Sequence, residues 1–219
     1  MVDALKSLLY AEASRPWTFL ELGFWIFFAV VLVGFAGLER RLALRNAYLM
    51  LASWFFYYHT SQWYVVLLIC TTAVDYGVGH ALHRTQRNLL RKLLLAISII
   101  SNLGVLFFFK YAYFVAEVWN DLTGLAWSPT PFWAGWANGQ LGTNFVEDVI
   151  LLPVGISFYT FQCLSYTVDV YRRNLEPVRR FTDFAFYVSF FPQLVAGPIV
   201  RASEFVPQIY QPYAVTRTQ

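Results

Sequence analysis

The polar side chains best suited to chemistry lie between residues 151 and 201, within segments otherwise apolar enough to cross a bilayer. Polar groups at that depth are costly, so they need partners or a function. The run from Pro153 to Tyr171 predicts a helix, because a proline is tolerated in a first turn. Spacings of four, three and four then place four side chains on one helical face, namely Phe158, Gln162, Ser165 and Asp169. We expect that face to line a bundle interior or a wet cavity rather than lipid.

The following span, residues 181–200, is predicted to be a broken helix. Pro192 interrupts it, and Gly197-Pro198 interrupts it again. A break at membrane depth leaves backbone groups unpaired, which is tolerated only where protein or water covers them. We therefore expect Gln193 to face the interior, where its amide can serve the backbone groups that the proline frees.

Two acids in apolar surroundings have structural as well as functional interpretations. Asp75 lies on a polar helical face that could be a functional seam, but we favour a structural ion pair with Arg84 or Arg87. Asp169 ends its helix, where an ion pair with the arginine three or four residues further on is a sufficient structural account.

The histidines and cysteines do not show the spacing of a metal site. His80 and His83 could share an ion, but no Cys, Asp or further His nearby completes a ligand set. His59 ends a short apolar segment and is interpreted as an interfacial side chain. Cys70 and Cys163 are interpreted as small buried hydrophobic residues. We predict no metal and no bound cofactor.

The composition is that of a polytopic membrane protein. Hydrophobic residues make up 58% and charged residues 13%, whereas charged residues form about a quarter of soluble domains. The 16 basic and 13 acidic residues are too few and too scattered for a nucleic-acid-binding protein.

Hydropathy predicts an all-α membrane helix bundle of about five to six spans, one of them short and one broken. Residues 1–219 are treated as part of one transmembrane domain. The spans lie near residues 19–38, 46–59 (the short one), 63–82, 93–119, 151–171 and 181–200. Residues 120–148 contain no Lys or Arg and several Trp, which is typical of an interfacial segment with a surface-lying helix.

The basic loops predict the orientation of the bundle. Loops near residues 40, 87 and 176 carry clustered arginines, so the positive-inside rule places all three on the cytoplasmic side. The interfacial segment and the N-terminus then lie outside, and the chain is an integral protein in contact with membrane lipid.

Three sequence motifs occur in the order LPVGISFYTFQ, SYTVDVYR and FYVSFFPQLVAGPIVR. In this order and spacing they resemble the central block of the membrane-bound O-acyltransferase family, and within it the alginate O-acetyltransferase membrane subunit. The resemblance implies a bacterial cytoplasmic (inner) membrane location. It also implies a cytoplasmic acyl thioester donor, acetyl-coenzyme A or an acyl-carrier protein, and a hydroxyl acceptor on an extracytoplasmic protein or polysaccharide such as alginate.

For individual residues, the resemblance implies a tunnel for the acyl group. Candidates for lining or gating it are Ser157, Tyr159, Gln162, Gln193 and Arg201. Lys110 stands in a word, FFKY, that such acyltransferases carry, but we favour a lysine that extends toward a lipid headgroup. Asp75, Lys110 and Asp169 are therefore assigned structural polar roles.

The base that an acyl transfer to a hydroxyl needs is not identified among these residues. The family resemblance implies an intramembrane histidine well after the PQLVAGPI word, and His59, His80 and His83 do not stand at that position. We expect the chain alone to be inactive, as the N-terminal half of an enzyme whose C-terminal half is its partner. An inactive fragment or half of a split enzyme with a structural role stays open, and a transporter is disfavoured because no internal repeat is found.

Overall fold

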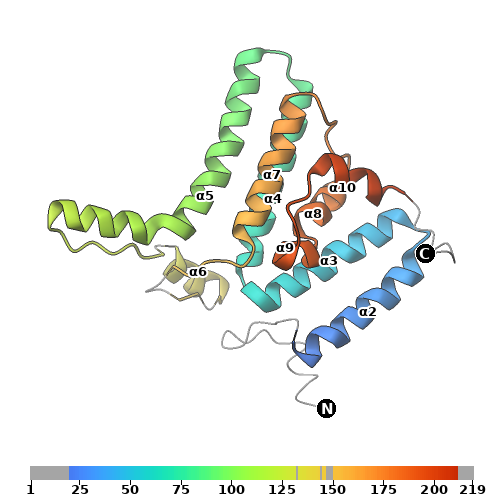
Figure 1. Cartoon of the computed structure of the whole chain (residues 1–219), viewed down its shortest axis with the longest axis horizontal. Helices are drawn as coiled ribbons and strands as arrows, with labels where there is room; N and C mark the ends of the chain where they lie inside the picture. Colours follow the sequence, from blue (N-terminus) through green and yellow to red (C-terminus); the bar gives the residue numbers. More distant parts are fainter. Residues whose placement is uncertain (1–19, 132, 144, 147–149, 212–219) are drawn as a thin grey trace.

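The structure is a computed structural model that describes residues 20–131, 133–143, 145–146 and 150–211. Figure 1 shows these residues as a bundle of helices, and no strand occurs in the described ranges, which confirms an all-α membrane helix bundle. In chain order the helices are α2 (Leu22–Leu38), α3 (Leu42–Ser61), α4 (Tyr64–Arg84), α5 (Asn88–Thr123), α6 (Ala134–Leu141), α7 (Ile156–Tyr171), α8 (Phe181–Ser189), α9 (Phe191–Ala196) and α10 (Ala202–Ile209).

The first three predicted spans correspond to α2, α3 and α4, with one correction. Residue 19, where the first span was expected to begin, lies outside the described residues. The helix that contains the segment 46–59 is longer than that segment, because α3 runs for 20 residues, which is about 30 Å at roughly 1.5 Å per residue. Hydropathy missed its first turn because that turn contains Arg45, which is buried with hydrogen-bond partners of its own.

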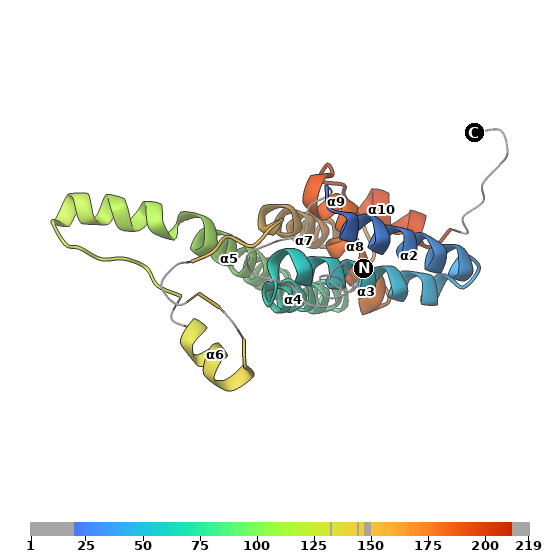
Figure 2. The ribbon, with the colours of Figure 1, turned by 90° about the horizontal axis from the view of Figure 1, so that it is seen from below.

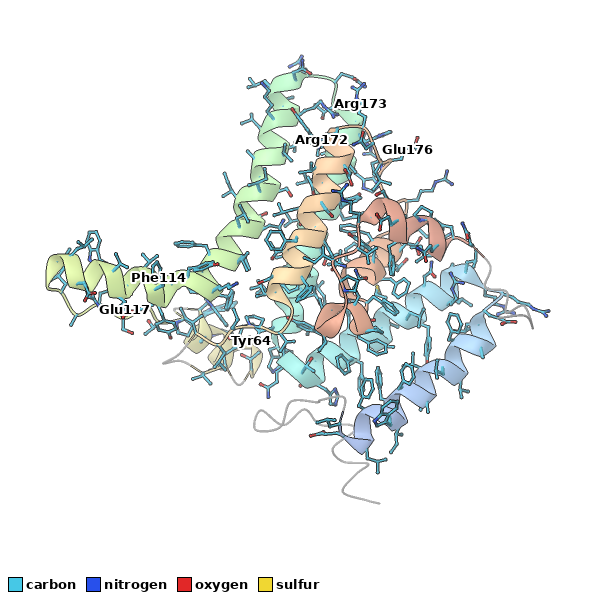
Figure 3. All side chains as sticks on the ribbon, in the orientation of Figure 1. Tyr64, Phe114, Glu117, Arg172, Arg173 and Glu176 are labelled. Atoms are coloured by element: carbon cyan, nitrogen blue, oxygen red, sulfur yellow. The ribbon has the colours of Figure 1, made fainter. Side chains whose placement is uncertain are left out.

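Helix α5 is longer than the predicted 93–119 span and has two parts. Figure 1 shows it bending sharply, so that its second part extends away from the bundle, and Figure 3 places Phe114 and Glu117 on that second part. The first part exposes a ridge of Leu93, Ile97 and Ile100, each at least 51% exposed, as a lipid-facing helix would. The segment that contains Lys110 is therefore a long apolar helix followed by an extension outside the bundle (Figure 1).

By length and hydropathy, α4 and α5 could each cross a membrane, and α2 is apolar but shorter, at 17 residues. One helix, α6, forms within the segment 120–148, and Figure 2 shows it apart from the main layer of helices. Residues 132, 144 and 147–148 of the same segment lie outside the described residues.

Two aromatic-rich clusters hold the bundle together. One joins α4, α5, α7 and α8 around Leu68, Tyr166 and Phe184. The other joins α2 and α3 to the broken helix, with Phe191 in ring contact with Phe27 and Phe56 at centroid distances of 5.4 and 5.3 Å. The second cluster fixes α9, and therefore the break before it, against α3.

The residues after Arg201 form one more helix. Helix α10 contains Pro207, a residue that usually interrupts a helix. Ala202, Val206 and Ile209 are all buried, so one apolar face stabilises the helix despite the hydrogen bond that a proline cannot donate.

Candidate functional site

The break between α8 and α9 is covered by α3. Phe190 has non-helical dihedral angles, and Pro192 stands in the first turn of α9, as the sequence predicts. The amide of Phe191 donates to the Ser53 hydroxyl at 3.3 Å, and that hydroxyl donates to the Leu49 carbonyl at 2.7 Å. The Phe191 amide at the break is thus paired inside protein, as a break at membrane depth requires.

Gln193 lies directly after this break and faces the interior, at 8% exposure. Its Nε2 donates to the Pro198 carbonyl at 3.1 Å, and its own carbonyl accepts from the Gly197 amide at 3.0 Å. The side chain therefore bridges the second interruption, at Gly197-Pro198, rather than the groups next to Pro192. Its predicted burial is correct.

The turn before α7 lies in close contact with α9. Gly155 has a φ of +72°, and a Cβ built there would lie 2.8 Å from the Leu194 carbonyl oxygen. The Val154 amide donates to the Ser61 hydroxyl at 3.1 Å. This turn delays the helix, which begins at Ile156 rather than at Pro153 as predicted, because only glycine fits the left-handed conformation so close to a neighbouring backbone.

The predicted polar face of α7 turns toward α8 and α10 at its centre. Gln162 is 2% exposed, and its Oε1 has no hydrogen-bond partner among the described residues. The Ser165 hydroxyl lies within hydrogen-bonding reach of Tyr187, whose own hydroxyl donates to the Val200 carbonyl at 3.0 Å. This region brings α7, α8 and the 197–200 turn together.

The other lining candidates are placed differently. Tyr159 is fully buried and its hydroxyl has no hydrogen-bond partner among the described residues, whereas Ser157 is only half-buried. Arg201 is exposed, and its carbonyl accepts from the amides of Glu204 and Phe205, so it is the N-cap residue of α10. The structure thus gathers Tyr159, Gln162 and Gln193 in the interior but not Arg201.

Asp75 is not paired with Arg84 or Arg87, so the favoured interpretation was wrong. It is fully buried, accepts hydrogen bonds from Ser98 and from Asn102 Nδ2 (2.7 Å) on α5, and accepts another from Thr167 on α7 (3.2 Å). Neutral donors from two neighbouring helices satisfy the carboxylate. Asp75 is therefore a structural link among α4, α5 and α7.

The other two structural assignments have mixed outcomes. Asp169 makes no ion pair with Arg172 or Arg173 within 4 Å in the part of the chain that the structure describes, so that interpretation was also wrong. Arg173 instead donates to the Gln86 side chain at 3.0 Å. Lys110 is exposed, with its Nζ 5.5 Å from the centre of the Tyr111 ring, which fits a lysine that extends outward.

A buried cluster that the sequence analysis missed joins α3, α8 and α10. Arg45 donates to the Ile209 carbonyl at 2.6 Å and to the Gln211 carbonyl at 3.3 Å, while Asn46 donates to Asp183 at 2.9 Å. Two of these residues had a recognisable sequence context, since Asn46 begins an apolar segment and Asp183 is an acid in the first turn of a predicted helix. Nothing in the sequence indicated that they meet.

Among the described residues, no group of three or more His, Cys, Asp and Glu side chains could hold a metal ion. His59 and His80 each pair Nδ1 with the carbonyl four residues earlier in their own helix, at 3.0 Å, and His83 is exposed at the end of α4. Cys163 is buried, as predicted, but Cys70 is exposed, which corrects its interpretation as a buried side chain.

No family model matches the chain, and no solved structure matches it significantly. Curated relatives do match. A peptidoglycan O-acetyltransferase of Helicobacter pylori is 34% identical over 185 residues, covering 74% of this chain and 32% of that protein. Probable alginate O-acetylases AlgI of Pseudomonas aeruginosa and Azotobacter vinelandii are each 34% identical to this chain, over 166 and 169 residues. These alignments cover 75% of this chain and 29% and 30% of those proteins.

This chain thus aligns with about a third of the length of these relatives. Because these relatives are of the same acyltransferase type and the alignments include most of the chain, the chain belongs to the membrane-bound O-acyltransferase family.

Proposed function

We propose that this chain forms part of an O-acetyltransferase in a bacterial cytoplasmic membrane. The donor is an acyl thioester, acetyl-coenzyme A or an acyl-carrier protein, and the acceptor is a hydroxyl of an extracytoplasmic polysaccharide such as alginate or peptidoglycan. The observation that carries the proposal is the 34% identity to a peptidoglycan O-acetyltransferase and to alginate O-acetylases over about three quarters of the chain.

The interior of the bundle supports a path for a polar group. Gln162 Oε1 and Thr160 Oγ1 are buried without hydrogen-bond partners among the described residues. A buried acceptor left unpaired costs about 1–3 kcal/mol of stability. A passing group that donates a hydrogen bond to it, such as a hydroxyl, would therefore be bound favourably. Gln162 lies one turn after Tyr159 on the same face of α7, and these two buried side chains, with the buried Gln193 of α9, form the proposed lining.

The base for the transfer is proposed to come from a part of the enzyme other than these 219 residues. A general base must reach the hydroxyl proton that it removes. His59 is 2% exposed at the end of α3, His80 is half-buried with its ring 4.3 Å from that of Tyr76, and His83 lies exposed beside the basic loops. Their positions therefore favour structural or interfacial roles, and the chain alone is proposed to be inactive.

The arrangement of loops supports the proposed orientation. Figure 1 shows the α4–α5 and α7–α8 loops together at one end of the bundle, while α6 lies toward the opposite end. We assign the end with the basic loops to the cytoplasm, where the donor resides, and α6 to the outer face. The N-terminus, proposed to be outside, lies beyond the described residues.

The test is acetyl transfer in membranes that contain this chain together with the part of the Pseudomonas aeruginosa relative that the alignment leaves uncovered. Gln193→Leu should lower the transfer rate at least tenfold while leaving membrane insertion intact, because it strands the Pro198 carbonyl inside the protein. Gln208→Leu on the exposed face of α10 is the matched control and should leave the rate unchanged.

Two results would contradict the proposal. Robust transfer by the chain alone would show that it contains the base. No transfer by a mixture whose two parts co-purify would reject the acetyltransferase function and favour the alternative, a structural part without activity.

A further inference from the structure

A cavity of about 300 Å³ lies at the end of the bundle where α4 and α7 both finish. Its polar lining consists of His83, Gln86, Arg91, Arg173 and Glu176, from the α4–α5 region on one side and the α7–α8 loop on the other. None of these side chains belongs to the proposed lining of the acyl path. Figure 3 shows Arg173 and Glu176 at this end of the molecule, beside the loop that follows α7.

Arg91 forms the floor of the cavity and is 6% exposed. It donates to the carbonyls of Leu82, Thr85 and Tyr171, so it caps the C-terminal ends of α4 and α7 together. These bonds use three of the five N–H groups of the guanidinium, which leaves two without a hydrogen-bond acceptor among the described residues. A buried cation with spare donors is thus fixed in place before any ligand arrives.

Arg173 supplies a second cation from the opposite wall. Its φ of +63° is in the left-handed region, where a non-glycine residue is strained, and its side chain is held by one hydrogen bond to Gln86 Oε1 at 3.0 Å. The strained turn and the amide contact direct a flexible arginine to the cavity. The neighbouring Arg172 does not line it.

The surrounding charge favours an anion strongly. The two segments 84–92 and 172–180 contain eight basic residues and one acid, Glu176. Glu176 makes no ion pair within 4 Å of a described basic side chain, so it does not neutralise the arginines directly. An incoming anion would find two guanidinium groups and an exposed imidazole, His83, in a recess with few competing acceptors.

We propose that this cavity binds the phosphate group of a phosphate ester. Planar guanidinium groups match the oxygen geometry of phosphate, and charge-assisted hydrogen bonds to them are roughly twice as strong as neutral ones. The cavity is large enough for a phosphate and the atoms next to it, while the rest of the ligand extends outside. This binding does not depend on acetyl transfer by the same chain.

Two sources carry such a group at this end of a membrane protein. One is the headgroup of an anionic phospholipid, and the other is the phosphate-bearing moiety of a soluble acyl thioester. The experiment measures binding to the protein in neutral detergent by calorimetry, with acetyl-coenzyme A in one arm and short-chain phosphatidylglycerol in the other. Inorganic phosphate is tested as a competitor in both arms.

We expect binding of one molecule per chain in at least one arm, weakened by inorganic phosphate. The arm that binds identifies the source. Arg173→Gln should weaken binding roughly tenfold, which corresponds to the loss of one charge-assisted contact, and Glu176→Gln should strengthen it. Arg172→Gln is the matched control for a change of one charge and should alter affinity less than about twofold.

The proposal is overturned if neither probe binds at millimolar concentration. It is also overturned if Arg172→Gln and Arg173→Gln weaken binding equally, because that would indicate a diffuse basic surface without a site. Thermal unfolding of both variants in the same detergent shows whether either has lost its fold. Should Arg173→Gln unfold, Glu176→Gln alone decides, and unchanged affinity there counts against the cavity.

Discussion

Replacing Asp75 tests whether this buried acid stabilises the bundle through hydrogen bonds or through its charge. It accepts bonds from Ser98, Asn102 and Thr167, on two helices other than its own. In membrane proteins a side-chain hydrogen bond between helices contributes about 0.6 kcal/mol on average and at most about 1.7 kcal/mol. Three such bonds give a range of about 2–5 kcal/mol for Asp75→Ala, large enough to measure by reversible unfolding in detergent.

Asp75→Asn separates the two explanations. The new amide oxygen can still accept from Ser98 and Thr167, but its NH₂ would face the NH₂ of Asn102. Asn102 can turn its amide, since its Oδ1 has no hydrogen-bond partner among the described residues and becomes the acceptor that is needed, at the loss of the bond that its Nδ2 donates to the Ser98 carbonyl at 3.0 Å. We therefore expect Asp75→Asn to cost less than about 1 kcal/mol.

Val74→Ala, at a neighbouring position that is 41% exposed, is the control for a general loss of stability in α4. The hydrogen-bond account would be refuted if Asp75→Asn destabilised the protein as much as Asp75→Ala, because the negative charge would then be the required feature. Equal stability of wild type and Asp75→Ala would refute the structural role altogether.

Three further predictions address packing, titration and topology. Gly79→Ala should destabilise the protein by about 1–3 kcal/mol in thermal unfolding, because the new Cβ would lie 2.6 Å from the Tyr166 hydroxyl, whereas Gly77→Ala, with nothing within 4 Å, should not. Burial and the Asp183 carboxylate raise the pKa of Tyr210 from 10.0 to about 12, so its contribution to stability is present below pH 10 and is lost as the pH rises toward 12. Tyr210→Phe should accordingly remove one late-titrating phenol from the ultraviolet titration curve, and removal of one that titrates near pH 10 would contradict this assignment. Cysteines introduced into α6 should react with an impermeant thiol reagent outside intact cells while cysteines in the α4–α5 loop do not, and reaction of both from one side would reject the topology.

Features that depend on local sequence were predictable. Hydropathy located α4 almost to the residue, and prolines marked the break before α9, because both signals act through neighbouring residues. The burial of Gln193 followed from the same break. The extent of α3 did not, because Arg45 looks like a loop residue until its partners on α10 are known.

The partners of buried charges were beyond the sequence for a physical reason. Asp75 is bound by residues 23, 27 and 92 positions away, and Arg91 by a carbonyl 80 positions away. Backbone carbonyls have no sequence signature, and Ser, Thr and Asn are common in every context. An oppositely charged residue close in the sequence was therefore a poor guide to the partners of Asp75.

The described part of the bundle pairs its buried arginines with neutral carbonyl groups at helix ends, whereas its interior turns are held by neutral hydroxyls. Arg45 and Arg91 donate to carbonyls at the ends of α10, α4 and α7, where the helix dipole adds to each hydrogen bond. Hydrogen bonds to charged groups contribute about 1.5–3 kcal/mol, against about 0.5–1.5 kcal/mol for neutral ones. The break before α9 and the start of α7 are held instead by the hydroxyls of Ser53 and Ser61, at 3.3 and 3.1 Å. The end with the basic loops is therefore the more firmly fixed, and the interior turns around Gln193 are those that local opening would separate at the lower free-energy cost.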